Sequence, residues 1–426
     1  MNWNLKTFLF LLLTNWLTLS SQEFVSVRDG QFFQNNKPYY FVGANYWYGS
    51  YLGNETNPQK GIERLKRELD FLKQKNVTNL RVLVAVEGTG KINGANRVTP
   101  PYQPEAGIFN DEILKGLDIF LAEASKRNMK AVLFLSNNWE WSGGFLQYLR
   151  WNDKIEENTF RKAMNWDELR DETRKFYRCD NCIAQYRNQV QRIVTRTNTI
   201  TGIPYKNDPT IMTWEIANEP RPMRPNVIPE FKKFIAETAS FIKSLDENHL
   251  VTSGSEGEMG SETMDLFKEV HSDSNIDYLT IHIWPKNWGW LNINDLEGTF
   301  SKAEENTLSY INNHIEVANQ LRKPLVLEEF GFPRDHHSFD INSSTKLRDQ
   351  YYQSAFEIFK KQRNSNGPFA GIVFWAYGGE AKPIPGQVYW KEGDDYMGDP
   401  PMEEQGLNAV FNTDKSTWKL IKKYAK

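Results

Sequence analysis

Two apolar segments that end in glutamate decide the fold of this chain. They are IMTWEIANEP at residues 211–220 and PLVLEEFG at residues 324–331. Each has the length and apolar content of a buried strand, and a proline or glycine follows that can end it. In a parallel barrel the carboxyl ends of the strands carry the active site, so these glutamates stand where chemistry is expected.

Six further apolar runs alternate with helical patterns. We expect strands at residues 40–45, 79–84, 130–136, 211–217, 250–254, 278–283, 324–329 and 371–376. Intervening segments such as 58–74, 112–127 and 227–245 carry apolar residues at the three-to-four spacing of a helix. Eight strand–helix units predict a single α/β domain over residues 22–426, a (β/α)₈ TIM barrel.

Two of the strand-to-helix connections are long. Residues 137–183 follow the third strand and contain Trp139 and Trp141, and residues 376–407 follow the eighth strand and contain Trp390. On a barrel such loops form the rim of the mouth. The chain has 14 Trp, and the faces of sugar rings stack on aromatic rings. We therefore expect these three tryptophans to contact a carbohydrate.

The beginning of the chain has the pattern of a secretory signal over residues 1–21. Lys6 precedes the apolar run 8–13, and Ser20 and Ser21 follow it. The run is too short to span a bilayer, and no later segment approaches the roughly eighteen apolar residues of a spanning helix. We expect a secreted, extracellular protein, or a periplasmic one in a bacterium, without a membrane partner.

Charge and cysteine content narrow the classes further. The net charge is −3 and the 51 basic residues are scattered, which gives no support for nucleic-acid binding. The only cysteines are Cys179 and Cys182, and in an exported protein we expect a local disulfide. A redox motif lacks the surrounding strand pattern, and a zinc site lacks further ligands at a suitable spacing.

We expect no cofactor and no metal. An acidic run near the end of the chain offers oxygen ligands for Ca²⁺, although a solvated loop is the simpler interpretation. Its members are Asp394, Asp395, Asp399, Glu403 and Glu404.

The strand-end glutamates are the candidate catalytic residues. Glu219 has the same side-chain parity as Glu215, which would lie deeper in the barrel. In the second segment we prefer Glu329 to Glu328, because Glu329 precedes an aromatic residue and Gly331, which permits a tight turn. From strands four and seven the two carboxyls can face each other across the mouth. Glycoside hydrolysis uses such a pair, one as acid/base and one as nucleophile or base.

The chain resembles glycoside hydrolase family 5 over nearly all residues after the signal, and within it the endo-β-1,4-mannanases. The motifs are LSNNWEWSGG (135–144), WEIANEPRP (214–222), IHIWP (281–285), LEEFG (327–331) and GDDYMGDP (393–400). The resemblance implies Glu219 as acid/base and Glu329 as nucleophile. It implies retaining hydrolysis of internal bonds in mannan, galactomannan and glucomannan by a monomer. We expect the charge of Glu329 to raise the pKa of Glu219.

The resemblance also implies roles for residues around this pair. Asn218 resembles the residue that binds the sugar 2-hydroxyl, and Arg81 the arginine that keeps Glu329 ionised. His282 resembles the histidine near the acid/base. Trp375 resembles the tryptophan under the sugar at the −1 position.

Two residues leave alternatives open. Trp284 stands where many family members have a tyrosine that bonds the nucleophile. An indole N–H donates but cannot accept, so Trp284 either donates to Glu329 or stacks on substrate. Arg221 resembles a residue on the leaving-group side, or pairs with a surface carboxylate. Alternative functions are a β-1,4-glucanase on the same scaffold and a non-catalytic sugar-binding barrel.

Overall fold

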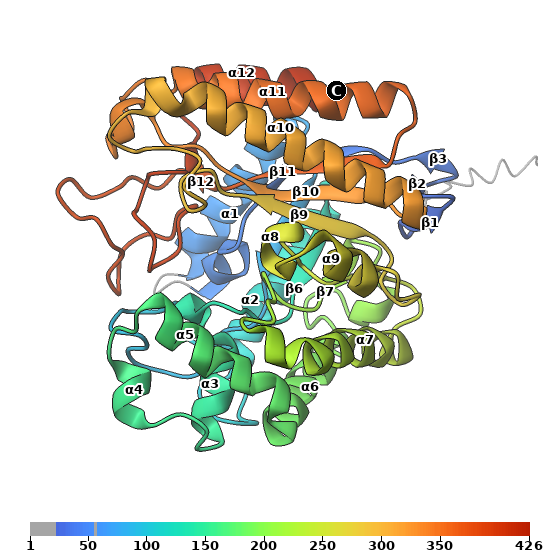
Figure 1. The fold of residues 1–426 in the computed structure, drawn as a ribbon, viewed down its shortest axis with the longest axis vertical. Helices are drawn as coiled ribbons and strands as arrows, with labels where there is room; N and C mark the ends of the chain where they lie inside the picture. The colour runs from blue at the N-terminus through green and yellow to red at the C-terminus, as the bar shows by residue number, and fades with distance from the viewer. Residues whose placement is uncertain (1–22, 55–57) are drawn as a thin grey trace, which may run out of the picture.

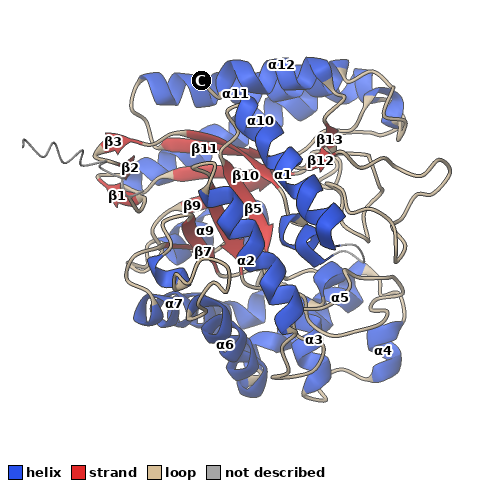
Figure 2. Cartoon of the chain, turned by 180° about the vertical axis from the view of Figure 1, so that it is seen from behind, coloured by secondary structure: helices blue, strands red, loops and turns tan. Residues whose placement is uncertain are grey.

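Eight parallel strands surrounded by helices form the centre of the structure (Figures 1 and 2). The computed structural model describes residues 23–54 and 58–426. The signal segment predicted at residues 1–21 lies outside the described residues. Within them, no helix is long and apolar enough to cross a membrane. The predicted (β/α)₈ barrel is confirmed.

Every predicted barrel strand is present, with small shifts at its ends. The strands are β4 (Phe41–Asn45), β5 (Asn79–Leu83), β6 (Lys130–Phe134), β7 (Ile211–Glu215), β8 (Leu250–Thr252), β9 (Leu279–Ile283), β10 (Leu325–Phe330) and β11 (Phe369–Phe374). Their hydrogen-bonded order is β8-β7-β6-β5-β4-β11-β10-β9. All their residues are buried, as expected for parallel strands that pack inside the barrel and against helices.

Backbone hydrogen bonds join the two ends of this order. The amide of Asp277 donates to the carbonyl of Val251 at 2.8 Å, and the amide of His282 donates to the carbonyl of Glu256 at 3.1 Å. These bonds link β9 to β8 and its connection, so the barrel is nearly closed. The carboxyl ends of β7 and β10 therefore face the same mouth.

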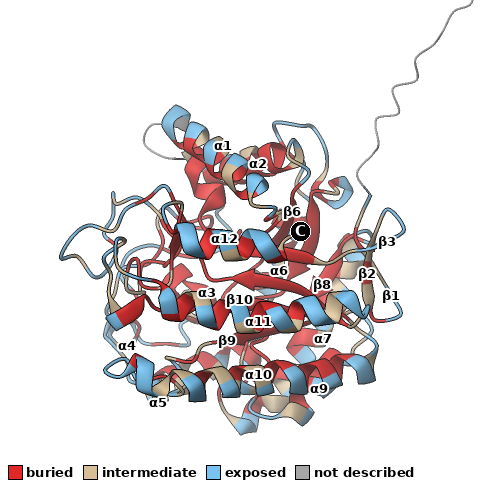
Figure 3. Cartoon of the chain, turned by 90° about the horizontal axis from the view of Figure 1, so that it is seen from above, coloured by how far each residue is buried: buried red, intermediate tan, exposed pale blue. Residues whose placement is uncertain are grey.

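Helices and short 3-10 turns follow each strand. They are η1 (Gly49–Asn54), α1 (Pro58–Gln74), α2 (Asp111–Ser125), η2 (Glu140–Ser142), α3 (Gly144–Trp151), α4 (Glu157–Arg161), α5 (Trp166–Thr173), η3 (Arg174–Arg178), α6 (Asp180–Val194), η4 (Tyr205–Asn207), η5 (Pro225–Val227), α7 (Ile228–Leu245), α8 (Glu258–Ser261), α9 (Met264–His271), α10 (Leu296–Leu321), η6 (Asp335–His337), α11 (Lys346–Asn364) and α12 (Lys415–Tyr424). Figure 3 shows the buried inner faces and exposed outer faces of α10, α11 and α12, the amphipathic pattern of helices that cover a sheet.

A small antiparallel sheet closes the amino end of the barrel. It consists of β1 (Ser26–Arg28), β2 (Gln31–Gln34) and β3 (Lys37–Pro38). Phe32 of β2 packs its ring edge-on against Tyr278, with ring centres 5.2 Å apart. In Figure 1 this sheet lies opposite the long loops of the mouth. The amino end of the barrel is therefore covered.

The connections at the mouth are long, as predicted after β6 and β11. The first contains α3 to α6, and the second contains β12 (Tyr377–Gly379) and β13 (Val410–Phe411). A third long connection, residues 84–110 between β5 and α2, was not predicted. Arg97 holds it together, donating to the carbonyls of Glu87, Thr89 and Gly90 at 2.6, 2.6 and 2.7 Å.

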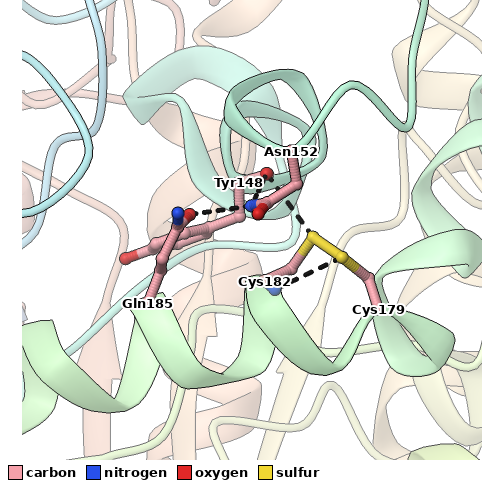
Figure 4. The surroundings of a disulfide bond; sticks show 5 residues. All are labelled: Tyr148, Asn152, Cys179, Cys182 and Gln185. Carbon is pink, nitrogen blue, oxygen red and sulfur yellow. Dashed lines mark hydrogen bonds between the residues drawn. A yellow bond between two sulfur atoms is a disulfide. The ribbon is translucent and has the colours of Figure 1, made fainter.

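The two cysteines are joined in a disulfide at the start of α6 (Figure 4). Cys179 is the N-cap of α6, and its sulfur accepts a hydrogen bond from the amide of Cys182 at 3.2 Å. The Cys182 sulfur lies 3.5 Å from the carbonyl oxygen of Tyr148 on α3. Asn152 and Gln185 join the same helices by a side-chain hydrogen bond of 2.8 Å. The disulfide therefore braces the insertion after β6.

Candidate active site

Glu219 and Glu329 meet at the mouth of the barrel. Glu219 lies just beyond β7 and is 6% exposed, and Glu329 lies in β10 and is 2% exposed. One oxygen of each carboxyl and a ring nitrogen of His282 all lie within 4.8 Å of one another. Glu219 has a left-handed φ of 52°, a strained conformation for a residue other than glycine that is often found at functional sites.

Arg81 lies beneath this pair and is completely buried. It donates to both oxygens of Glu215 at 2.6 and 2.8 Å, to Asn218 Oδ1 at 2.8 Å, and to Glu329 Oε1. Burial raises the pKa of Glu329 to about 7, against the opposing charges of His282 and Arg81. Arg81 therefore contacts the proposed nucleophile and also fixes the amide of Asn218, whose side chain lines the cavity above.

Glu219 is held by two donors. His282 Nδ1 lies 2.6 Å from its Oε1, and the indole N–H of Trp139 donates to its Oε2. Burial would raise the pKa of Glu219, but the hydrogen bond and charge of His282 lower it below the ordinary value. The expectation that Glu329 raises this pKa is therefore wrong for the free site, because it left out the charge of His282.

Trp284 donates from its indole Nε1 to Glu329 Oε2 at 3.3 Å. Its ring also meets Trp375 edge-on, with ring centres 5.8 Å apart. Of the two alternatives for Trp284, the structure places it as a donor to Glu329. Gly331 makes room for it, because a Cβ there would lie 2.9 Å from Cζ3 of Trp284. Gly331 does not have a positive φ, so space for the indole, and not a tight turn, requires this glycine.

Both consecutive glutamates of β10 point into the barrel. Pairing with β9 shifts register between Leu327 and Glu329, which leaves Glu328 as an extra residue in a β-bulge. Glu328 Oε2 lies 3.8 Å from Nε of Arg81 and 3.7 Å from Nε2 of His282. In a regular strand only one of the two carboxyls would face inward. Only one of the two was expected at the site, and the structure brings both to it.

A cavity of about 860 Å³ lies above the two carboxyls. Its aromatic members are Trp139, Trp141, Trp166, Trp284, Trp288, Trp375 and Tyr389, and its polar members include Asn218, Arg221, Glu256, Lys286, Asn287, Glu403, Glu404 and Asn408. The indole N–H of Trp375 is buried and has no hydrogen-bond partner among the described residues. Apolar rings with a few polar groups are typical of a sugar-binding site.

Arg221 lines the cavity and pairs with a buried carboxylate instead of a surface one. It donates two hydrogen bonds to Glu256, one of them at 2.5 Å. Its guanidinium lies over the rings of Trp139 and Trp166, 5.2 and 5.9 Å from their centres. Cation–π contacts of this kind hold the two indoles in place.

Several of these lining residues were not picked out from the sequence, among them Trp166, Trp288 and Glu256. Trp166 begins α5 and is 48% exposed, and the rule that selected Trp139 in the same connection would also have selected it. Glu256 carried no comparable signal, and Glu403 was expected only as a member of the acidic run, because their positions depend on how the connections after β8 and β11 fold.

Trp390 does not line the cavity above the carboxyls. It is 3% exposed, its ring stacks on Tyr396 at 5.6 Å, and its Nε1 donates to the carbonyl of Asp394 at 3.2 Å. The expectation that Trp390 contacts substrate is not supported by this position, because the loop after β11 folds over it. Its role is packing within that loop.

The acidic run does not converge on one point. Asp399 accepts from the amide of Gly406 at 2.8 Å, and burial raises its pKa to about 6. Glu404 pairs with Lys286, and Asp394 accepts from the amide of Lys391 at 2.7 Å. The carboxylates of this run fix the loop after β11.

The chain is similar to plant enzymes along most of its length. Mannan endo-1,4-beta-mannosidase 1 of Solanum lycopersicum is 30% identical over 382 residues, which cover 86% of this chain and 86% of that protein. Mannan endo-1,4-beta-mannosidase 4 of the same plant is 28% identical over 367 residues, covering 84% of each. A family model described as GH family 5 beta-mannosidase-like matches residues 22–426.

Several solved structures are also similar to this chain. A glycoside hydrolase family 5 mannosidase from Rhizomucor miehei is 32% identical with a TM-score of 0.84, covering 94% of this chain and 96% of that one. A mutant of it in complex with mannosyl-fructose gives a TM-score of 0.85. The endo-1,4-beta-mannanase of the same organism shares the fold, with a TM-score of 0.67 at 22% identity, covering 95% and 98%.

A barrel with two facing carboxyls at its mouth belongs to a known class of enzyme, the glycoside hydrolases. The match over residues 22–426 and the relatives above show that this chain belongs to glycoside hydrolase family 5, as a β-mannosidase-like member.

Proposed function

We propose that this protein hydrolyses β-mannosidic bonds with retention of configuration, and that internal bonds of mannan, galactomannan and glucomannan are its first candidate substrates. The observation that carries the proposal is the close approach of Glu219 and Glu329, whose oxygens lie within 4.8 Å. Retaining enzymes place these groups about 5–5.5 Å apart, whereas inverting enzymes leave about 6.5–9.5 Å for a water.

In the proposed reaction Glu329 attacks the anomeric carbon, and the bond to the leaving oxygen breaks as that oxygen receives a proton. Glu219 delivers the proton, which in the free site lies in its hydrogen bond with His282. Glu219 then accepts a proton from the water that releases the sugar from Glu329. Arg81 and Trp284 support the negative charge that returns to Glu329.

A second candidate is a mannosidase that acts on chain ends. The loop after β11 covers the mouth above β4 and β5. Trp47 donates to the carbonyl of Gly398 at 2.9 Å, and Tyr396 packs against Trp47 and Tyr51 at ring distances of 5.6 and 5.3 Å. A cavity closed on one side fits a chain end better than a continuous chain.

Product analysis of mannohexaose in ¹⁸O-labelled water distinguishes these candidates. Internal cleavage yields products of intermediate length from the start, whereas chain-end cleavage yields mannose and mannopentaose. The label shows which product received water, and proton NMR of the first product shows the anomer. An initial α-anomer would reject the retaining mechanism.

Rates on galactomannan, glucomannan and carboxymethyl cellulose test the substrate class. Faster turnover of cellulose would replace the mannan proposal with a β-1,4-glucanase. Binding of mannohexaose without hydrolysis would favour the non-catalytic barrel.

We also propose that the protein is secreted as a monomer. The motivation is the signal pattern of residues 1–21. Amino-terminal sequencing of protein from the culture medium should begin near residue 22, and light scattering should give the mass of one chain. Retention inside cells with residue 1 intact would reject secretion.

A further inference from the structure

A buried contact between Glu328 and His282 has no part in the proposed reaction. Glu328 Oε2 lies 3.7 Å from His282 Nε2. Both atoms are buried, and neither has a hydrogen-bond partner among the described residues. Leaving a buried polar atom without a partner destabilises a protein, so two such atoms that face each other require an explanation.

We propose that Glu328 is a positioning residue that acts through His282. Its carboxylate holds a proton on Nε2, so that His282 stays doubly protonated and donates from Nδ1 to Glu219. The β-bulge in β10 is the structural device that makes this possible, because it turns Glu328 inward beside Glu329. The inference rests on the proposed acid/base role of Glu219.

The geometry around the ring favours the charged form. Nδ1 lies 2.6 Å from Glu219 and 3.4 Å from Glu329, and Nε2 faces Glu328. A neutral imidazole has one N–H and leaves one of these carboxylates facing a lone pair, whereas imidazolium has a donor for each side. Burial would lower the pKa of His282, but the charge of Glu329 and the other two carboxylates raise it to about 10.

Charged groups from every neighbouring strand face this centre. They are Arg81 from β5, Glu215 and Glu219 from β7, Glu256 from beyond β8, and Glu328 and Glu329 from β10. Arg81 hydrogen-bonds to Glu215 and Glu329 but not to Glu328, which lies 3.8 Å away. Glu328 Oε2 therefore lies between two positively charged partners, Arg81 and His282, and faces the ring of His282 at 3.7 Å.

This arrangement sets the pH above which Glu219 and His282 lose the proton that the reaction requires. Glu219 and His282 together must hold the proton that the leaving oxygen receives. A negative charge beside Nε2 raises the affinity of this pair for the proton. Removing that charge lowers the affinity, so the pair loses the proton at a lower pH.

Nitrogen-15 NMR of histidine-labelled protein tests the charge state directly. The chain has 6 His, and His282→Asn identifies the signal of His282. In the wild type we expect both ring nitrogens to stay protonated through pH 8. In Glu328→Gln the proton should be lost at a pH lower by about one unit or more. A neutral His282 at pH 7 in the wild type would overturn the proposal. This readout needs no turnover, so it stands apart from a failure of the proposed hydrolysis.

The pH profile of kcat/KM gives the functional test. In Glu328→Gln the alkaline limb should move down by about one unit or more, whereas Glu328→Asp, which keeps the charge, should retain the wild-type limb. In a His282→Asn background Glu328→Gln should move the limb no further. An unchanged limb and an unchanged His282 titration in Glu328→Gln would overturn the proposal.

Glu87→Gln is a matched control that separates the loss of a negative charge beside His282 from a general loss of stability. Glu87 is also a completely buried carboxylate, held by Gln189 at 2.8 Å and by the amide of Gly144 at 3.0 Å. Glu87→Gln should lower stability without moving the alkaline limb. If Glu328→Gln does not fold, the wild-type titration and Glu328→Asp still decide the outcome, because loss of imidazolium in either rejects the role.

Discussion

The two sides of the barrel mouth are built differently. Above β6 to β11 the mouth is a cavity lined by indoles, by Arg221 and by part of the loop after β11. Above β4 and β5 it is covered, because the loop after β11 packs there through Trp390 and Tyr396. None of the described residues in the connections 46–54 and 84–110 lines the cavity. This difference is the basis of the chain-end candidate, in which substrate would extend from the catalytic pair toward the open side.

The largest effect on kcat/KM is expected from changes to the catalytic pair, Glu219 and Glu329, where the two sides of the mouth meet. Glu329→Ala should lose more than about 10⁴-fold in kcat/KM on every mannoside, because no nucleophile remains. Glu219→Ala should lose about 10²–10⁴-fold on mannohexaose, but far less on a nitrophenyl mannoside, whose leaving group needs no proton. Steady-state kinetics on both substrates measure the contrast. Substantial hydrolysis by Glu329→Ala would contradict the assignment.

The covered side can be opened by Tyr396→Ala. The ring packs on Trp47 and Tyr51, so its loss should lower the free energy of unfolding by about 2–3 kcal/mol. If the cover restricts cleavage to chain ends, the variant should release longer products from mannohexaose. Tyr396→Phe keeps the ring and is the matched control. An unchanged product pattern in a folded Tyr396→Ala would show that the cover does not set the cleavage position.

Binding of a long substrate along the open side should depend on Trp166. This indole is 48% exposed and lies 6.0 Å from the ring of Trp139, where it can stack on sugars beyond the cleaved bond. Trp166→Ala should raise KM for mannohexaose about tenfold, or about 1.4 kcal/mol, and leave a nitrophenyl mannoside unaffected. Ile108, 57% exposed and outside the cavity, provides Ile108→Ala as the control. Equal KM changes for both substrates would argue against stacking.

The smallest effect on hydrolysis is expected from the disulfide beneath the open side. A double change of Cys179 and Cys182 to serine removes a short covalent loop, so the free energy of unfolding should fall by about 2 kcal/mol. Serine at 179 still caps α6, and kcat/KM should not change. Denaturant unfolding and kinetics measure the two quantities. A loss of activity in the folded variant would mean that this bond shapes the cavity.

Periodicity predicted the barrel well, because each strand is a buried apolar run with a clear end. All eight strands were expected, and Glu219 just beyond β7 meets Glu329 of β10 as their positions in the sequence implied. The connection 84–110 was missed, since it contains no helix and depends on Arg97 binding its carbonyls.

Side-chain placement at the rim was less predictable. Trp139 and Trp390 both stand in long loops at the mouth and were expected to play the same role. Trp139 donates a hydrogen bond to Glu219, whereas Trp390 is buried under its own loop. The inward turn of Glu328 was not readable either, because a β-bulge depends on the register with β9 and not on local pattern.

The close contacts of Gly331 also constrain how this site can change. A side chain at 331 would meet the indole of Trp284 at 2.9 Å and the backbone carbonyl oxygen of Trp375 at 3.2 Å. A smaller ring at 284 would remove only the first of these contacts, because the carbonyl belongs to the backbone. We therefore expect glycine to persist at 331 among relatives, whichever ring supplies the donor at 284.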